Sequence, residues 1–172
     1  APMIRATGAK LLAHHRAVAR IEGIDRGLQD GDVVRVGRTV EFIVLDTPGH
    51  TMTHVCLLSR TDPPALFCGD TLFNAGAGNC RSGDPEALFD TFEKQLADLP
   101  DDTRVYPGHD YLVNNLRFTL DREPDNDRAR TLLEDLMESG DTGERRVLTL
   151  GLEREINTFF RLDSETVIRK VR

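Results

Sequence analysis

Three polar side chains each follow a glycine that closes a short apolar segment: His50, Asp70 and His109. In α/β proteins, ligand-binding and catalytic groups gather at the ends of strands, and glycine lets the backbone turn sharply there. Neutral imidazoles and a carboxylate are ligands for zinc and similar divalent ions, and one carboxylate can bridge two ions because each oxygen can bind one. The pattern predicts part of a metal-hydrolase site, with Asp70 as a catalytic group.

The other histidines lack this pattern. His54 lies four residues after His50 and opens a strand-like segment, so we interpret it as a strand residue rather than as a group that supports the site. His14 and His15 are not preceded by a glycine turn, and we expect them to be surface or structural residues. A single glycine followed by His or Asp is usually an ordinary turn, whereas three in series favour a shared site.

Short apolar segments alternate with turns in the first 110 residues, which predicts a sheet. The expected strands are residues 9–14, 33–36, 39–46, 54–59, 65–68 and 103–107. Gly37 is placed to close a hairpin between the second and third of them. Three strands of this set end at the three predicted ligands, so the sheet must position the site.

Helical spacing appears in two places. Residues 84–100 carry leucine and phenylalanine at three- and four-residue intervals after Asp84-Pro85, which predicts an amphipathic helix packed on the sheet. Two further helices are expected within residues 111–140, separated by Pro124. We therefore predict an α/β protein with a sheet-based domain over residues 1–110 and a helical substrate-binding region over residues 111–172.

Composition narrows the class of partner. The chain has 172 residues, is 39% hydrophobic and carries a net charge of -7, with acidic and basic residues interleaved. This predicts no nucleic-acid surface and no membrane anchor, and favours a small-molecule partner. Three unpaired cysteines in apolar or turn segments indicate reduced thiols and a cytoplasmic protein. No apolar run is long enough for a membrane span, and no signal peptide is recognisable.

Four segments carry a family resemblance. They are TPGHT (47–51), LFCGDTLFNAGAG (66–78), LPDDTRVYPGHDYLVNNLRFTLDREPDN (99–126) and EREINTFFR (153–161). Together they resemble the hydroxyacylglutathione hydrolases, the glyoxalase II branch of the metallo-β-lactamase superfamily. The resemblance implies an αββα sandwich with a helical C-terminal region. It also implies that His50 binds one metal, that His109 binds a second, that Asp70 bridges them, and that Tyr111 contacts the glutathione part of the substrate.

The function implied by the resemblance is hydrolysis of a glutathione-type thioester such as S-lactoylglutathione. Two divalent ions, zinc first and iron or manganese as alternatives, would provide a metal-bound hydroxide that attacks the thioester carbonyl. The thiolate would then leave without a strong acid. The expected partner is therefore a small-molecule thioester.

The chain departs from the family pattern in two respects. Relatives carry a T-H-x-H-x-D-H element upstream of the region that corresponds to residue 1, and this sequence does not contain it, so we expect a chain that lacks the N-terminal part of the sandwich. In the loop 78–83, Asn79 and Arg81 stand where the family has a basic residue and an aromatic one. We expect both to contact substrate, with weaker selectivity for glutathione.

Two other functions stay open. A persulfide dioxygenase, from a neighbouring branch, would use a single iron bound by two histidines and an aspartate. The chain could also be an inactive fragment or a binding module, because three ligands do not complete two metal sites.

Overall fold

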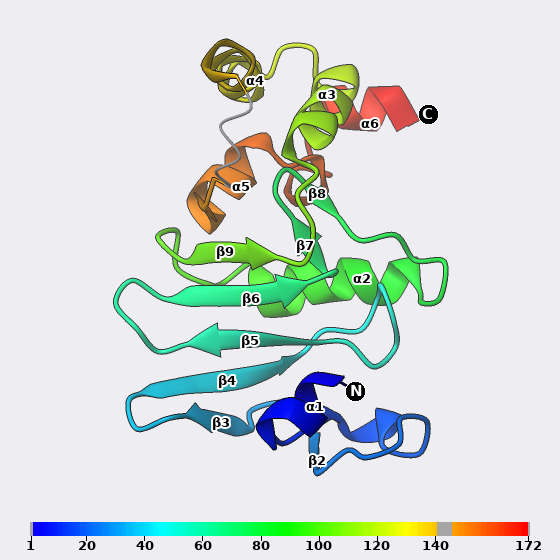
Figure 1. Cartoon of the computed structure of the whole chain (residues 1–172). Helices are drawn as coiled ribbons and strands as arrows, with labels where there is room; N and C mark the ends of the chain where they lie inside the picture. The colour runs from blue at the N-terminus through cyan, green and yellow to red at the C-terminus, as the bar shows by residue number, and fades with distance from the viewer. Residues whose placement is uncertain (1, 141–145, 172) are drawn as a thin grey trace.

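The computed structural model of the protein describes residues 2–140 and 146–171. Its centre is a six-stranded sheet in the order β10-β9-β6-β5-β4-β3 (Figure 1). The strands are β3 (Val33–Val36), β4 (Val40–Asp46), β5 (Val55–Ser59), β6 (Ala65–Gly69), β9 (Arg104–Pro107) and β10 (Leu148–Thr149). Most helices of the C-terminal half stand beyond the β9 side of the sheet (Figure 1).

Strand direction decides which strand ends meet. Strands β3, β4, β5 and β6 pair antiparallel in sequence order, and β6 pairs parallel with β9. Strands β4, β6 and β9 therefore run in the same direction. Their carboxyl ends share one edge of the sheet, which is where the three predicted ligands follow.

One helix, α2 (Pro85–Thr91), covers one face of the sheet and continues as a π-helical turn, η2 (Phe92–Leu96). Asp84 fixes its start, because Asp84 Oδ1 accepts the backbone N–H of Ala87 at 2.9 Å. The apolar side of the helix packs on inward-facing residues of β5, β6 and β9, and this burial stabilises the sheet on that face. The resulting core comprises Cys56, Leu66, Cys68, Leu72, Leu88, Phe92, Leu96, Val105 and Leu150.

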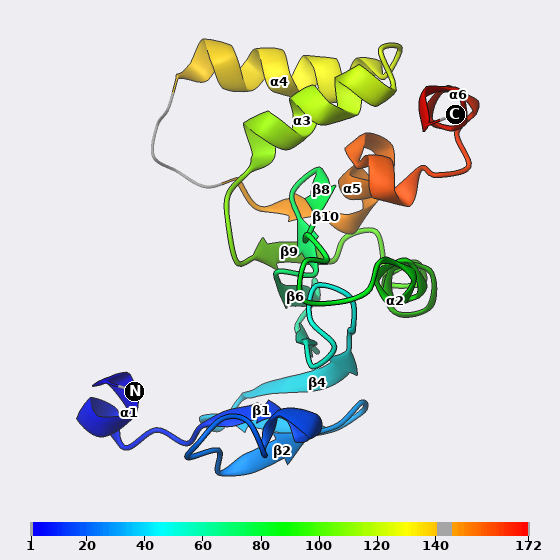
Figure 2. The same cartoon turned by 90° about the vertical axis from the view of Figure 1, so that its right-hand side faces the viewer.

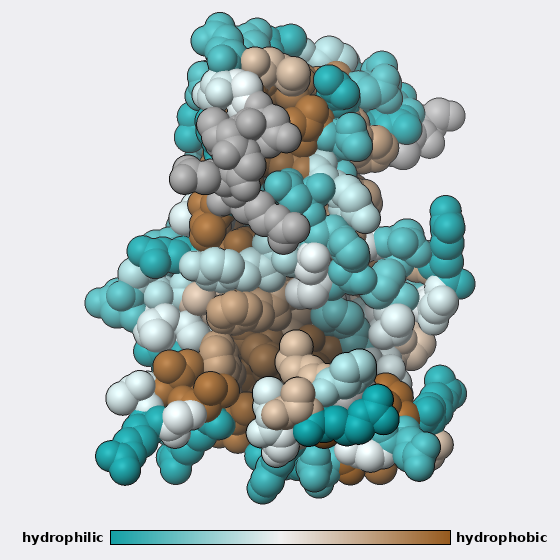
Figure 3. Space-filling model, viewed as in Figure 1, coloured by the Kyte–Doolittle hydropathy of each residue, from teal (hydrophilic) through white to brown (hydrophobic). Residues whose placement is uncertain are grey.

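The opposite face of the sheet carries a row of aromatic rings. Successive strand residues point to opposite faces, so Phe67 points away from α2 while its neighbours are buried, and Phe67 is 42% exposed. Its ring stacks on Tyr106 with centroids 4.9 Å apart and meets Phe42 edge-on at 5.4 Å. Figure 3, which looks onto this face, shows apolar surface over the strands.

The N-terminal segment lies on the side of the sheet away from α2 (Figure 2). It contains α1 (Pro2–Thr7), β1 (Leu12–His14), η1 (His15–Ala17) and β2 (Arg26–Leu28), with β1 and β2 paired in parallel. Leu28 packs with Val34 and Val44 in a small second core. This segment therefore covers part of β3 and β4.

The C-terminal half packs its helices around a third core. The elements are α3 (Leu112–Arg122), α4 (Asp127–Ser139), α5 (Leu150–Ile156), η3 (Thr158–Phe160) and α6 (Glu165–Val171). Ala75 joins this core from the turn of a short hairpin, β7 (Leu72–Phe73) and β8 (Gly76–Ala77), which follows Asp70. The helical region is thus anchored next to the predicted bridging aspartate. No helix among the described residues is long and apolar enough to cross a membrane.

The predicted elements are present with small shifts at their ends, and the hairpin at Gly37 is confirmed by the pairing of β3 with β4. The first strand is shorter than expected, because only residues 12–14 pair with β2. The C-terminal region is mainly helical, as predicted, and also contributes one short strand. β10 comes from that region and pairs antiparallel with β9, so the sheet and the helical region are joined by a strand.

Candidate metal centre

The three predicted metal ligands lie together at one edge of the sheet. His50 lies in the turn after β4, Asp70 directly follows β6, and His109 follows β9. Asp70 stands between the two histidines: its Oδ2 is 3.4 Å from His50 Nε2, and its Oδ1 is 3.5 Å from His109 Nε2. Each carboxylate oxygen therefore faces a different imidazole nitrogen, which is the arrangement a carboxylate needs to bridge two ions.

The backbone orients the His50 ring. His50 Nδ1 lies 2.7 Å from the carbonyl oxygen of Asn79. Because a carbonyl only accepts, Nδ1 carries the hydrogen, and in the neutral ring Nε2 keeps its lone pair toward Asp70. A lone pair facing a carboxylate oxygen is stabilised by a cation between them, and metal-binding histidines commonly donate their other N–H in this way. The donor set fits a divalent ion.

Two glycines allow the chain to approach Asp70 closely. A Cβ at position 108 would lie 2.6 Å from Asp70 Oδ1, and a Cβ at position 78 would lie 1.8 Å from the Asp70 carbonyl oxygen. The Gly108 N–H also donates to the Gly69 carbonyl at 2.8 Å, which joins the ends of β6 and β9. Glycine at positions 78 and 108 is therefore required for this placement of the carboxylate.

His54 is part of this edge, although its sequence position indicated only a strand residue. Its Nε2 accepts the backbone N–H of Asp70 at 3.2 Å, so that nitrogen is not available to a metal. Its Nδ1 lies 3.0 Å from Thr47 Oγ1 and 2.9 Å from Thr71 Oγ1. Burial and the nearby His50 lower the pKa of His54, which keeps the ring neutral.

The described residues provide ligands for two incomplete sites rather than one complete site. In residues 2–140 and 146–171, no group of three or more His, Cys, Asp or Glu side chains is arranged to hold a single ion. An ion between Asp70 and either histidine would meet two protein ligands from this part of the chain. Zinc sites normally use three or four protein ligands, so these described residues alone do not complete the coordination of an ion.

Tyr111 lies beside His109 at the start of α3. Its ring stacks on His109 with centroids 5.4 Å apart, and Phe73 meets both rings edge-on, at 5.2 Å from Tyr111 and 5.9 Å from His109. Tyr111 is 45% exposed, beside the candidate centre.

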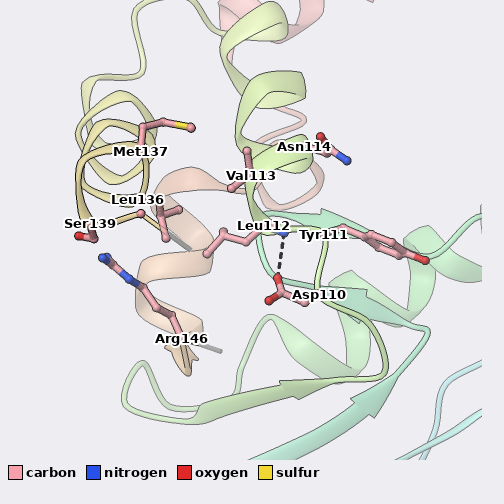
Figure 4. Close-up of a pocket in the computed structure, with 10 residues that line it drawn as sticks. Asp110, Tyr111, Leu112, Val113, Asn114, Leu136, Met137, Ser139 and Arg146 are labelled. Carbon is pink, nitrogen blue, oxygen red and sulfur yellow. Dashed lines mark hydrogen bonds between the residues drawn. The ribbon is translucent and has the colours of Figure 1, made fainter. Parts of the chain in front are cut away.

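A cavity of about 380 Å³ lies between α3, α4 and Arg146 (Figure 4). Asp110 and Tyr111 contribute to its wall, but the Tyr111 ring points away from the other lining side chains (Figure 4). His50, Asp70 and His109 do not line it. The candidate metal ligands therefore lie at the sheet edge, outside this cavity.

The loop after β8 contains the other two predicted substrate contacts. Asn79 and Arg81 are both exposed, and the Arg81 backbone N–H donates to Asn79 Oδ1 at 3.2 Å. The loop runs beside the His50 turn, because the Asp84 N–H donates to the Gly49 carbonyl at 2.9 Å. The structure brings Asn79 to the site through its backbone carbonyl, a role that its side-chain type did not indicate.

The remaining histidines lie at the N-terminal segment. His14 is buried, with Nε2 3.1 Å from Asp46 Oδ1, and its ring is 4.5 Å from the ring of His15. The pKa of His14 is lowered, mainly by burial, although Asp46 acts to raise it. These contacts correspond to a structural role.

Family models match the chain in two consecutive parts. Residues 6–109 match the metallo-beta-lactamase superfamily, and residues 110–172 match the hydroxyacylglutathione hydrolase C-terminus. The chain belongs to the metallo-β-lactamase superfamily. The fold class predicted from the sequence is thereby confirmed, and membership implies divalent metal ions at the site.

The chain is also similar to curated proteins named hydroxyacylglutathione hydrolase. The chain is 61% identical over 171 residues to a hydroxyacylglutathione hydrolase of Nitrosococcus oceani. The aligned region covers 99% of this chain and 65% of that protein. It is also 61% identical over 173 residues to one from a Polaromonas species, with 100% of the chain and 65% of that protein covered. The chain thus spans 65% of the length of these relatives.

Solved structures show the same fold in more distant proteins. ETHE1 from Myxococcus xanthus is 27% identical with a TM-score of 0.67, covering 98% of this chain and 59% of that one. TTHA1623, solved in a di-iron-bound form, is 26% identical with a TM-score of 0.54, covering 92% of this chain and 68% of that one. The metallo-β-lactamase fold is therefore seen both in the family models and in the arrangement of the backbone.

Proposed function

We propose that the protein hydrolyses thioesters of glutathione or of a related small thiol, with S-lactoylglutathione as the first substrate to test. The observation that carries the proposal is the position of Asp70 between His50 and His109, at 3.4 and 3.5 Å. The names of the relatives that are 61% identical support the substrate class.

His50 and Asp70 would hold one divalent ion, and His109 and Asp70 the second. Zinc suits imidazole and carboxylate donors best, and iron or manganese is also compatible. When bound, such ions make water acidic enough to act as a nucleophile near neutral pH, and they polarise a carbonyl group. The protein itself orients the His50 ring: the hydrogen bond from Nδ1–H to the Asn79 carbonyl keeps Nε2 directed toward Asp70.

Tyr111 would contact the thiol part of the substrate. Its partly exposed ring is fixed against His109 and Phe73, so a hydrogen bond from its hydroxyl needs little reorganisation of the side chain. The leaving thiolate needs no strong acid, because thiols ionise at a pKa of about 8.5. The exposed Asn79 and Arg81 would contact the same part of the substrate from the opposite loop.

The loop chemistry favours broad thiol selectivity. Asn79 cannot make the charge-assisted bond that a basic residue makes to a carboxylate, and Arg81 can replace it only from a different position. We therefore propose that S-lactoylglutathione is hydrolysed with a raised KM and that thioesters of other small thiols turn over comparably. Steady-state kinetics on a panel of thioesters checks this. A low KM for S-lactoylglutathione with no activity on the other thioesters would contradict it.

We also place the protein in the cytoplasm. Cys56, Cys68 and Cys80 are all free thiols in the structure, which suits a reducing compartment. Detection of the tagged protein in cell fractions tests this assignment.

The metal centre is tested by metal analysis of the natural protein that contains this chain. Two equivalents of metal per chain are expected, and Asp70→Ala should remove most of the metal together with thioester hydrolysis. Asp102→Ala, an exposed aspartate on a turn before β9, is the matched control and should leave both unchanged. One equivalent of iron without hydrolysis would favour the persulfide dioxygenase reaction, and full metal content in Asp70→Ala would refute the assignment of Asp70.

A further inference from the structure

His54 links the ends of three strands at the candidate metal centre. It directly precedes β5, and its ring lies between the Thr47 turn after β4 and the Asp70 turn after β6. Gly69 makes room for the ring: its φ is +48°, and a Cβ there would lie 2.8 Å from His54 Nε2. The turn that carries Asp70 is therefore built around the imidazole.

A directed series of hydrogen bonds fixes the tautomer of His54. Nε2 accepts the Asp70 N–H, so Nδ1 carries the ring hydrogen and donates to a threonine hydroxyl, with Thr71 Oγ1 at 2.9 Å. Thr71 Oγ1 then donates to Thr47 Oγ1 at 3.4 Å, and Thr47 Oγ1 to Cys56 Sγ at 3.3 Å. Nδ1 also lies 3.0 Å from Thr47 Oγ1, so both threonine hydroxyls face the ring hydrogen.

The series ends on the strand where it began. Cys56 Sγ donates to the carbonyl oxygen of Cys68 at 3.6 Å, two residues before Asp70. The same set of side chains therefore contacts β6 on both sides of Gly69, at the carbonyl before it and at the N–H after it. This arrangement restrains the backbone from which the Asp70 side chain extends.

We propose that His54 is a positioning residue that holds the Asp70 backbone so that its two carboxylate oxygens face His50 and His109. The proposal rests on the proposed two-metal function and extends it to a residue that binds no metal. Residues that orient metal ligands in this way typically change metal affinity by about 10- to 100-fold when they are replaced. A histidine that only packed between strands would affect the stability of the fold and not the affinity for metal.

The first experiment measures zinc affinity of the natural protein by chelator competition. His54→Leu should bind zinc at least about tenfold more weakly, because the Asp70 N–H loses its acceptor. His54→Gln, whose amide can accept one hydrogen bond and donate another, should recover most of the affinity. His15→Leu, at an exposed histidine of η1, is the matched control and should bind zinc as the unchanged protein does. Unchanged zinc affinity in His54→Leu would overturn the proposal.

A second pair of variants covers the case in which His54→Leu does not fold. Thr71→Val removes the nearer of the two hydroxyls that face the Nδ1 hydrogen while keeping the side-chain shape, and Thr71→Ser keeps the hydroxyl. Zinc affinity should fall in Thr71→Val and stay near the original value in Thr71→Ser. Equal affinity in the two variants would overturn the proposal. Zinc affinity is measured without substrate, so a failure of the proposed thioester hydrolysis is distinguished from a failure of this inference.

Kinetics provide a further readout. Because His54 acts on Asp70 and not on substrate, His54→Leu should lower kcat and leave KM within about twofold, and His54→Gln should recover most of kcat. A raised KM with unchanged kcat would contradict this role.

Discussion

Glu153 is a fully buried carboxyl group on α5, away from the candidate metal ligands. Its oxygens accept the Ala75 N–H at 2.9 and 3.2 Å and the Asn157 amide at 2.8 Å. Burial raises its pKa to about 8, although the hydrogen bonds from Asn157 and Ala75 act to lower it. Glu153 therefore joins the hairpin next to Asp70 to α5 while holding a proton at neutral pH.

The pKa of Glu153 predicts a pH dependence of stability. The unfolded carboxyl titrates at its ordinary value of 4.5 and the folded one at about 8, so the folded state keeps the proton between these values. Its contribution is fully present below pH 4.5 and is lost as the pH rises through about 8. Glu153→Gln cannot ionise, so its free energy of unfolding should fall less between pH about 5 and about 8 than that of the unchanged protein.

Urea unfolding at several pH values measures how steeply the free energy of unfolding falls with pH. This slope can be compared between variants that differ in absolute stability. Glu134→Gln, at an exposed glutamate of α4, should keep the slope of the unchanged protein. Parallel pH curves for the unchanged protein and Glu153→Gln would show that Glu153 is ionised throughout this range.

The three thiols differ in accessibility, which predicts an order of alkylation. Burial raises the pKa of Cys56 to about 11 and raises that of Cys68 well above its usual value, and both are fully buried. Cys80 is partly exposed, with a pKa raised by burial and by Asp84. Because the thiolate is the reactive form, iodoacetamide should label Cys80 first and slowly in the native protein. Cys80→Ser should prevent native labelling, and equally fast labelling of Cys56 would contradict the prediction.

At the scale of the elements, an ion pair connects the end of α3 to the segment between η3 and α6. Arg161 contacts Glu123 with both ends of its guanidinium, at 2.8 and 3.1 Å, and Ser164 Oγ donates to Glu123 at 2.7 Å. Burial acts to raise the pKa of Glu123, but the bonds from Arg161 and Ser164 outweigh it and lower the pKa. The carboxylate therefore stays ionised in a buried position.

Removing this charge should loosen the C-terminal helices. Glu123→Gln leaves the guanidinium of Arg161 without its partner, and since Arg161 is one-third exposed we expect a loss of about 2 kcal/mol, below the usual cost of breaking a buried pair. Urea unfolding measures it. Glu165→Gln is the matched control, because its pair with Arg169 is exposed and should contribute little. Equal stability of the two variants would contradict a structural role for the Glu123 pair.

Elements with a clear period were predictable from the sequence. The hairpin of β3 and β4 and the helix α2 follow from alternation and from helical spacing. The short strands β7, β8 and β10 were not predictable, because two residues cannot establish a period and their pairing depends on the packed fold.

The residues of the candidate site were likewise predictable only in part. Glycine turns at strand ends pointed to His50, Asp70 and His109, and the structure brings these three side chains together. His54 accepts a backbone N–H from a residue 16 positions away, and no local pattern signals such a contact. Asn79 orients His50 through its carbonyl, a group that every residue offers, so its side-chain type carried no information about this role.

At the scale of the whole molecule, the sheet edge and the helical region meet around one short hairpin. The Asn115 amide of α3 donates to the Asn74 carbonyl at 2.8 Å, and Glu153 of α5 accepts the next N–H, from Ala75. Phe73, the residue before them, contacts both His109 and Tyr111. The helices therefore determine where the candidate metal ligand and the candidate substrate contact lie relative to each other.

Ligand count across the whole chain leads to the last prediction. His50 and His109 face different oxygens of Asp70, so residues 2–140 and 146–171 offer two of these ligands to each ion. Zinc sites usually require three or four protein ligands, and we expect this polypeptide to bind zinc weakly and to hydrolyse S-lactoylglutathione negligibly. Zinc titration against a chelator and a thioester assay measure both, with the natural protein as control. Tight binding of two ions with robust turnover would contradict the prediction and would show that other groups, such as His14 or His15, complete the centre. Loss of that turnover in His14→Gln or His15→Gln would then identify the added ligand.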